Sequence, residues 1–254
     1  MAEDVVALER FLTHLRHHLE GWQSKVNNDF SKEAYDIEMA ALSVDPVYAK
    51  FHLASPDYIL IRLMGRMSVS IGRRLGELYD KIPRLAAQAR YKLDREKVVV
   101  KFDGLELDVA LTLSELSRED VKHLLETCQR HLKIRLERFK GLATEIRYNF
   151  NPNDSARLRK DKHLGEVLQA EGYYPLYLVF AENSPRLGDA VAGLKRGGWQ
   201  FLIGTPALQF MADLVGFDIG NVLDRPEVSK EIKKEIQALM QSIRKSYAYQ
   251  QAGL

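Results

Sequence analysis

A carboxylate and a guanidinium stand two positions apart, at Glu145 and Arg147, in a run that alternates between apolar and polar residues. Along residues 142–150 this period of two places the charged side chains on one face of a predicted strand and apolar side chains on the other. Burying such charges within a sheet is costly unless they pair, bind a metal or face a solvent-filled cleft. We interpret this face as the wall of a functional cleft; a solvated edge strand is the alternative.

A second carboxylate, Asp108, belongs to a predicted β-hairpin. Residues 98–113 form two β-rich runs separated by Asp103-Gly104, which is a strong signal for a two-residue hairpin turn. If the strand that carries Asp108 lies beside the strand that carries Glu145, the two carboxylates converge on one point.

Two converging carboxylates can hold Mg²⁺, because this ion prefers hard oxygen ligands. Bound Mg²⁺ stabilises the charge of a phosphodiester transition state and activates water. A cation beside the carboxylates, here Arg147, can hold the scissile phosphate. The combination of Asp108, Glu145 and Arg147 therefore predicts the chemistry of a nuclease.

An Asn-rich turn and a basic helix follow the predicted strand directly. Helix N-termini and basic side chains bind phosphates, while Asn and Arg can read the edges of adenine and guanine. We therefore expect DNA contacts from Asn149, Asn151, Asn153, Ser155, Arg157, Arg159 and Lys160. The alternative is that the Asn residues only build the turn and that the basic run is a solvated helix face.

The longest helical pattern of the chain begins at residues 55–57, where Ser-Pro-Asp provides an N-cap and a proline in the first turn. It carries a further acid, Glu77, close to two arginines. Arg73 and Arg74 could contact the DNA backbone, or they could pair with Glu77 within the helix.

Helices and β-rich runs alternate in the second half of the chain. After the strand that carries Glu145 we expect a strand at 174–181, a helix at 185–196, a strand at 199–203 and a helix at 206–215. Such alternation implies parallel strands joined by crossover helices. A further helix is expected to begin at Ser117 and to end near residue 141.

These elements predict an α/β fold with a mixed central β-sheet flanked by helices, and with extra helices at both ends of the chain. We expect an N-terminal helical segment, residues 1–54, packed on a catalytic core, residues 55–220, and a C-terminal helix within residues 221–254.

Composition sets limits on the partners and the compartment. The 254 residues carry a formal net charge of only +2, so affinity for nucleic acid has to come from local patches. A single cysteine, Cys128, excludes an intrachain disulfide and a multi-cysteine zinc site. The longest apolar runs are too short to span a bilayer, and the N-terminus is acidic where a signal peptide is basic. We expect a cytoplasmic protein without a membrane partner.

Three stretches resemble motifs of the PD-(D/E)XK nuclease superfamily, in which an Asp on one strand and an acid-x-Lys on the next form the metal site. Residues 105–110, LELDVA, resemble the strand of the metal-binding Asp, and Glu145-Ile146-Arg147 resembles the next motif. Glu77 resembles the acid often found on the first core helix. Over residues 55–216 the resemblance implies a restriction-endonuclease-like fold, with Asp108 and Glu145 as Mg²⁺ ligands and with Glu77 and Arg147 completing the catalytic residues.

A longer stretch, EIRYNFNPNDSARLRKDKHL followed by GYYPLYLVF and GGWQFLIGTPAL, is similar to the ApaLI-like group of type II restriction endonucleases. This resemblance implies a homodimeric, Mg²⁺-dependent enzyme that hydrolyses phosphodiester bonds at a short palindromic site in double-stranded DNA. The two-fold symmetry of the protein would then match the symmetry of the site.

The chain departs from the superfamily pattern at Arg147, which stands where the superfamily has lysine. Arginine stays protonated, so it can stabilise charge but is a poor general base. Lys101, on the hairpin face of Asp108, and Lys140, just before the strand, are candidate substitutes. The alternative function is a non-cleaving DNA-binding protein on the same scaffold.

Overall fold

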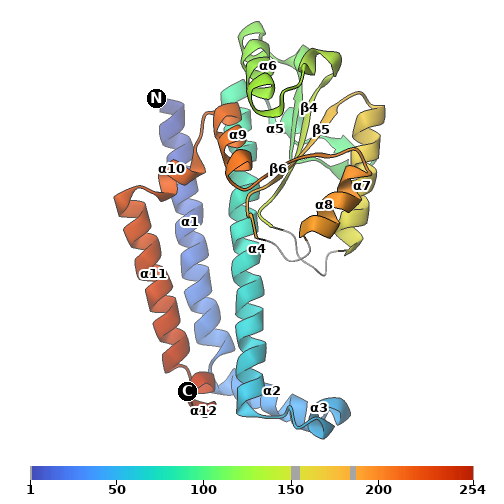
Figure 1. Ribbon diagram of the computed structural model, residues 1–254. Coiled ribbons are helices and arrows are strands. Elements are labelled where there is room, and N and C mark those ends of the chain that lie inside the picture. Colours follow the sequence, from blue (N-terminus) through green and yellow to red (C-terminus); the bar gives the residue numbers. More distant parts are fainter. Residues whose placement is uncertain (1, 150–154, 184–186, 254) are drawn as a thin grey trace. The chain divides into compact units, whose positions relative to one another are not determined.

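The computed structural model describes residues 2–149, 155–183 and 187–253 (Figure 1). The chain forms two compact units. Unit 1 contains residues 1–9 and 76–222, and unit 2 contains residues 10–75 and 223–254. Two long helices, α1 (Ala2–Asp29) and α4 (Pro56–Tyr91), each contribute to both units.

Unit 1 is built on a four-stranded mixed sheet with the strand order β3-β4-β5-β6. The strands are β3 (Val109–Thr112), β4 (Gly141–Arg147), β5 (Tyr174–Val179) and β6 (Gln200–Ile203). β3 is antiparallel to β4, whereas β4, β5 and β6 are parallel. The crossovers contain α7 (Ser155–Ala170) and α8 (Leu187–Lys195). The predicted mixed sheet, with helices at both ends of the chain, is therefore confirmed.

Helices cover both faces of this sheet (Figure 1). α7 and α8 cover one face, where Ala143, Tyr177, Leu168, Leu194 and Trp199 belong to one buried apolar cluster. The last part of α4, α6 (Arg118–Leu132) and α9 (Thr205–Val215) lie on the other face. The face that carries Glu145 and Arg147 is the one beneath α7.

The helix α6 is shorter than the sequence predicts. Ser117 caps it by accepting a hydrogen bond from the backbone N–H of Asp120 at 3.1 Å. The helix ends at Leu132, well before residue 141, because Lys133 adopts the left-handed conformation with φ 58°. A 3-10 turn, η2 (Leu136–Arg138), then leads into β4.

The predicted two-residue hairpin is present as a separate small sheet. Its strands are β1 (Lys101–Phe102) and β2 (Leu105–Glu106), and they pair antiparallel. Asp103 and Gly104 both have positive φ, 49° and 74°, as a type I′ turn requires. His163 of α7 contacts Asp103 at 2.8 Å, so the hairpin lies beside α7. Two short helical turns, α5 (Arg95–Val98) and η1 (Leu113–Glu115), precede β1 and follow β3 in the sequence.

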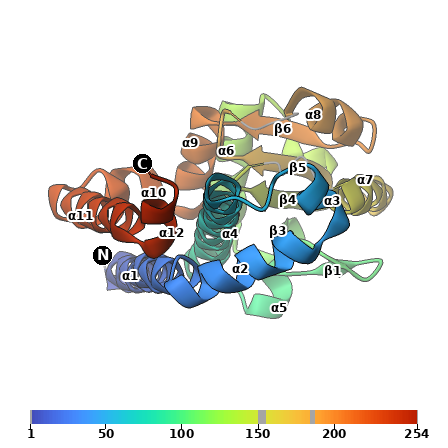
Figure 2. The ribbon, with the colours of Figure 1, turned by 90° about the horizontal axis from the view of Figure 1, so that it is seen from below.

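Unit 2 is helical within its described residues. Besides parts of α1 and α4 it contains α2 (Lys32–Val44), α3 (Pro46–Lys50), α11 (Pro226–Lys245) and α12 (Tyr247–Gln251), and α10 (Ile219–Leu223) leads into it. α12 lies against α2, where the rings of Tyr35 and Tyr247 meet edge to face with centroids 5.3 Å apart (Figure 2). Ion pairs from Glu38 to Arg62 and Arg66 join α2 to α4.

Large apolar side chains are exposed along the segment from α2 to the first half of α4. They are Ile37, Val44, Val47, Phe51, Ile61, Met64 and Val69, with exposed fractions of 41 to 82%. α2 also buries Tyr35 and Leu42, so it has an apolar side chain on more than one face. Exposed apolar surface of this extent is typical of an interaction site.

Within the described part of the chain, no helix combines the length and the apolar character that crossing a membrane requires.

Candidate active site

Asp108 and Glu145 lie side by side at one end of the β3–β4 pair. The ladder between these strands begins with Val109 opposite Thr144, and Asp108 and Glu145 are the residues that adjoin this first pair. The backbone N–H of Ile146 donates to Asp108 Oδ2 at 2.7 Å and fixes this carboxylate against β4. Asp108 is therefore held against β4 at Ile146, the residue that follows Glu145.

Both carboxylates are buried, since Asp108 is 2% and Glu145 is 0% exposed. β4 is a central strand between β3 and β5, so the alternative of a solvated edge strand is wrong. The polar face of β4 is instead covered by side chains from other segments, which have to supply partners for its charges.

Arg147 is held by three partners on this covered face. Its Nε donates to the hydroxyl of Tyr177 at 3.1 Å. Its Nη2 donates to Asp161 Oδ2 at 3.2 Å and lies 3.0 Å from Glu145 Oε1. Tyr177 also donates to Asp161 Oδ2, at 2.7 Å.

Arg157 bridges the same two acids from α7. Its Nε donates to Asp161 Oδ1 at 2.9 Å, and its Nη2 donates to Glu145 Oε1 at 3.0 Å. Its side chain is 42% exposed, compared with 23% for Arg147. Arg157 therefore forms the solvent-facing side of this network.

Arg84 reaches the site from α4. Its Nη1 donates to Glu106 Oε1 at 3.0 Å, and its Nη2 pairs with Asp108 Oδ1. The inner part of the site thus contains three carboxylates and three guanidinium groups, from Asp108, Glu145, Asp161, Arg84, Arg147 and Arg157. These formal charges balance.

A cavity of about 280 Å³ opens over this network, between the β1–β2 hairpin and α7. Its charged lining is Arg84, Glu106, Asp108, Arg147, Arg157, Lys160 and Asp161. The cations outnumber the acids by one, so the lining favours an anion. Its volume is near the lower end for ligand sites and is sufficient for a phosphate group with an adjoining sugar. The cavity lies near the carboxyl ends of β4 and β5, where open α/β sheets commonly bind ligands.

Burial determines the titration of the inner groups. Burial, with a contribution from the charge of Asp161, raises the pKa of Glu145 from its ordinary value of 4.5 to about 7, although Arg147 and Arg157 lower it. Burial also raises the pKa of Tyr177 far enough to keep its hydroxyl a neutral donor. Burial alone would lower the pKa of Arg147, but Tyr177, Glu145 and Asp161 outweigh this effect and keep the guanidinium charged.

The comparison with known proteins adds no assignment to this geometry. No known protein family, curated protein or solved structure matches the chain.

The carboxylate oxygens of Glu145 and Asp108 differ in whether they already have partners. Glu145 Oε2 is buried and accepts no hydrogen bond, which is costly for a carboxylate and leaves one oxygen available to a cation. Both oxygens of Asp108 have partners, Arg84 and the N–H of Ile146. In the described residues, no three His, Cys, Asp or Glu side chains are arranged to hold a metal. A divalent cation could use Asp108 as a ligand only if Arg84 left that carboxylate.

Glu77 does not line the cavity. It precedes Arg84 on α4 by seven residues, which is two turns and roughly 10 Å along the helix axis. The side chain that α4 contributes to the cavity is therefore a cation, whereas the sequence led us to expect an acid.

The two candidate substitutes for the missing lysine do not line the cavity either. Lys140 precedes β4, and five residues of extended chain, roughly 17 Å, separate it from Glu145. Its Nζ lies 3.4 Å from Glu171. Lys101 is exposed and lies opposite Glu106 in the hairpin. The lysine that does line the cavity is Lys160.

The residues expected to contact DNA after β4 fall into two groups. Arg157 and Lys160 line the cavity. Ser155 and Arg159 are exposed on α7, and Asn149 is partly buried two residues after the end of β4. The beginning of α7 thus presents both cavity-facing and solvent-facing polar groups.

The other four expected DNA contacts have two different outcomes. Asn151 and Asn153 lie outside the described residues. Arg73 and Arg74 belong to unit 2, where they line a groove of about 860 Å³ between α1 and α4. The guanidinium of Arg74 lies over Gly21, where a larger side chain would collide with it.

Sequence reasoning misses three functional candidates: Arg84, Asp161 and Tyr177. Asp161 has a local signal, because it follows Arg157 by four residues on one helix face. Tyr177 pairs with Glu145 across β4 and β5, which only the strand register reveals. Arg84 has no local signal, since its partner Asp108 is 24 residues away.

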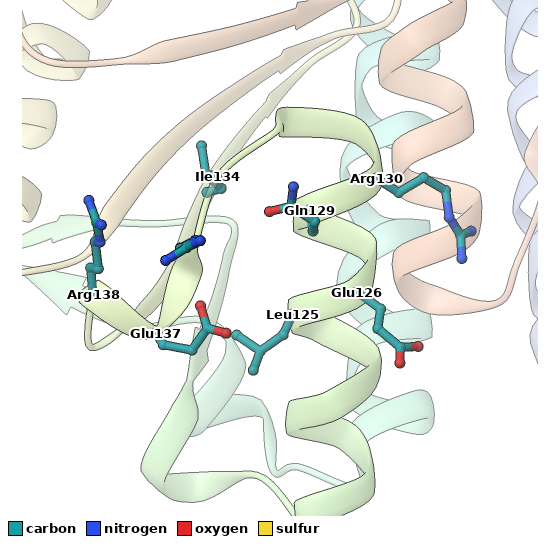
Figure 3. Close-up of a pocket in the computed structure, with 8 residues that line it drawn as sticks. Leu125, Glu126, Gln129, Arg130, Ile134, Glu137 and Arg138 are labelled. Carbon is teal, nitrogen blue, oxygen red and sulfur yellow. The ribbon is translucent and has the colours of Figure 1, made fainter.

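A second hollow of unit 1, about 780 Å³, lies between the end of α6 and η2 (Figure 3). Its charged side chains diverge. Arg130 extends toward α9, where it pairs with Asp213 at 2.9 Å, and Arg138 points in the opposite direction. This hollow therefore lacks the convergent groups of the first cavity.

Proposed function

We propose that this protein is a metal-dependent, site-specific deoxyribonuclease of the type II restriction endonuclease class. Its reaction would be the hydrolysis of phosphodiester bonds at a short palindromic site in double-stranded DNA. The observation that carries the proposal is the pair of buried carboxylates, Asp108 and Glu145, beneath a cavity with four cationic side chains. The proposal places the protein in the cytoplasm, where its substrate is found.

Each inner residue has a role in this proposal. Asp108 and Glu145 would hold Mg²⁺, with Glu145 Oε2 as the oxygen that has no partner. Mg²⁺ bound there supplies charge stabilisation and an activated water. Arg147 is oriented by Tyr177 and Asp161 and stabilises the negative charge that develops on the phosphate.

The direct test is incubation of the purified protein with plasmid or phage DNA in Mg²⁺ or in EDTA. We expect discrete fragments only with Mg²⁺. Glu145→Gln should abolish cleavage and leave DNA binding largely intact, because it removes a charged metal ligand and keeps its shape. Glu171→Gln is the matched control, since Glu171 is exposed at the other end of β4 and should leave cutting unchanged. Cutting by Glu145→Gln at the wild-type rate would eliminate the proposed metal site.

The proposal includes a homodimer, because cleavage of both strands at a symmetric site needs two active sites. The seven exposed apolar side chains of residues 37–69 support a second copy as the occupant of that surface. At on the order of 100 Å² each they offer roughly 700 Å², close to the area of about 800 Å² that each partner buries in a standard interface. Phe51→Glu should therefore lower the mass measured by light scattering, and Lys50→Glu beside it should not. An unchanged dimer in the first variant would contradict this choice of surface.

A non-cleaving DNA-binding protein is the second candidate. Arginines occupy both proposed metal ligands, and this observation favours the second candidate. Arg84 pairs with Asp108, while Arg147 and Arg157 pair with Glu145, so cations lie where a metal would bind. This candidate predicts a salt-sensitive gel shift without nicking at any concentration of Mg²⁺.

A further inference from the structure

Three arginines occupy the carboxylates that the proposed function assigns to the metal, and two of them, Arg84 and Arg157, come from helices. Arg84 Nη2 pairs with Asp108 Oδ1, and Arg157 Nη2 donates to Glu145 Oε1 at 3.0 Å. Both arginines also line the cavity. The same guanidinium groups can therefore face either a carboxylate or a ligand in the cavity.

Arg147 also lines the cavity and lies 3.0 Å from Glu145 Oε1, but it differs from these two in its further partners. It is anchored by Tyr177 and Asp161 on the covered face of β4. Arg157 can release Glu145 and keep its Nε bond to Asp161, because that bond uses another nitrogen. Arg84 can likewise release Asp108 and keep Glu106, whose side chain is 44% exposed. Each of these cations thus has a second acid that holds it at the cavity.

We propose that Arg84 and Arg157 are phosphate-binding residues that, in the free protein, occupy Asp108 and Glu145 in place of a metal. A phosphodiester entering the cavity draws both guanidinium groups away and exposes two adjacent carboxylates to a divalent cation. The proposal rests on the nuclease function proposed above and adds an order to it, in which DNA prepares the metal site.

The physical consequence is a coupling between DNA and metal. Guanidinium groups form strong bidentate bonds with phosphate, so the exchange of a carboxylate for a phosphodiester retains their charge-assisted hydrogen bonds. Once the guanidinium groups have moved, Asp108 and Glu145 repel each other, and a cation between them relieves that repulsion. Linkage requires that DNA and metal strengthen each other's binding by the same factor, typically about 5- to 150-fold.

The coupling can be tested without cleavage and without DNA, by replacing the arginine that competes with the metal for a carboxylate. Mn²⁺ binding is measured by calorimetry and by loss of the free-ion signal in electron paramagnetic resonance. We expect Arg157→Gln to bind Mn²⁺ more tightly than the wild type, within the range of about 5- to 150-fold given above. Arg84→Gln should act in the same direction. Lys162→Gln is the control, because it removes a charge from α7 at a residue that does not line the cavity.

The other half of the proposal concerns DNA. In EDTA, Arg157→Gln should weaken the binding of a 20-base-pair duplex more than Lys162→Gln does, and its affinity should depend less steeply on salt. Circular dichroism and thermal melts establish that each variant is folded.

The outcomes separate the two proposals. Unchanged Mn²⁺ affinity in folded Arg157→Gln and Arg84→Gln, with wild-type Mn²⁺ binding that depends on Glu145, would overturn the competition and leave the nuclease intact. If the wild type and both variants bind no Mn²⁺, with or without duplex, the metal site and the competition are both overturned. Tighter Mn²⁺ binding together with weaker DNA binding in the two arginine variants supports the proposal.

Discussion

Replacing Asp161 by asparagine removes the acid that holds two arginines in place while keeping the size of the side chain. Asp161 is 3% exposed and accepts hydrogen bonds from Arg157, Arg147 and Tyr177. The amide of asparagine has one acceptor oxygen, and its NH₂ group would face guanidinium donors. We therefore expect Asp161→Asn to destabilise unit 1.

The magnitude follows from the burial of the two cations. Removing one partner of a buried ion pair lowers the free energy of unfolding by about 3–5 kcal/mol. Arg147 retains Glu145 and Tyr177, and the 42% exposed side chain of Arg157 can recover solvation, so the lower part of this range applies. We expect a loss of about 3 kcal/mol in the free energy of unfolding, or roughly 6–12 °C in the melting temperature.

The chain provides its own probe for this measurement. Trp199 donates from Nε1 to the backbone carbonyl of Asp161 at 2.6 Å, and the chain has one other tryptophan, Trp22, in unit 2. In a Trp22→Phe background, urea unfolding followed by tryptophan fluorescence thus reports on unit 1. Asp103→Asn is the matched control, because the exposed pair of Asp103 with His163 should contribute less than about 1 kcal/mol. If Asp161→Asn lowers the free energy of unfolding by no more than Asp103→Asn does, the role of Asp161 as an anchor is refuted.

Three further predictions concern the same unit. Tyr177→Phe should cost about 1–3 kcal/mol, measured in the same assay, because it removes the buried hydroxyl that hydrogen-bonds both Asp161 and Arg147. Gly141→Ala should prevent folding or lower the melting temperature strongly, since a Cβ there would collide with the backbone of β3; a melt within 2 °C of the wild type would contradict this. The native protein holds the proton of Glu145 more tightly than the unfolded chain does, so the resulting stabilisation is complete below pH 4.5 and is lost as the pH rises through about 7. Urea titrations across this range should show that loss in the wild type and not in Glu145→Gln.

The local features of the site could be predicted from sequence because short-range signals determine them. The Asp103-Gly104 dipeptide specifies the hairpin, and the period of two along β4 places Glu145 and Arg147 on one face. β3 pairs with β4, as the sequence led us to expect, and Asp108, the residue before β3, accepts a hydrogen bond from the N–H of Ile146 on β4.

The surroundings of that face could not be predicted in the same way. A period of two identifies which side chains share a face, but it does not identify what covers the face. The sequence therefore left open whether Glu145 and Arg147 contact solvent, and only the crossover helix α7 and strand β5 supply Asp161 and Tyr177 as partners. The predicted length of α6 was wrong because the apolar stripe continues past Leu132, whereas the backbone leaves the helix at Lys133.

The contrast between Glu77 and Arg84 shows why the sign of a charge cannot be transferred from a motif to a site. Both residues are on α4 and are seven residues apart, so they lie near the same face of the helix. Which of them reaches Asp108 depends on the axial position of α4 along the sheet, and a shift of two turns replaces an acid by a base. The inner carboxylates and guanidinium groups are balanced only because Arg84 occupies this position. With an acid there, the site would carry excess negative charge, whereas with Arg84 its three carboxylates are matched by three guanidinium groups.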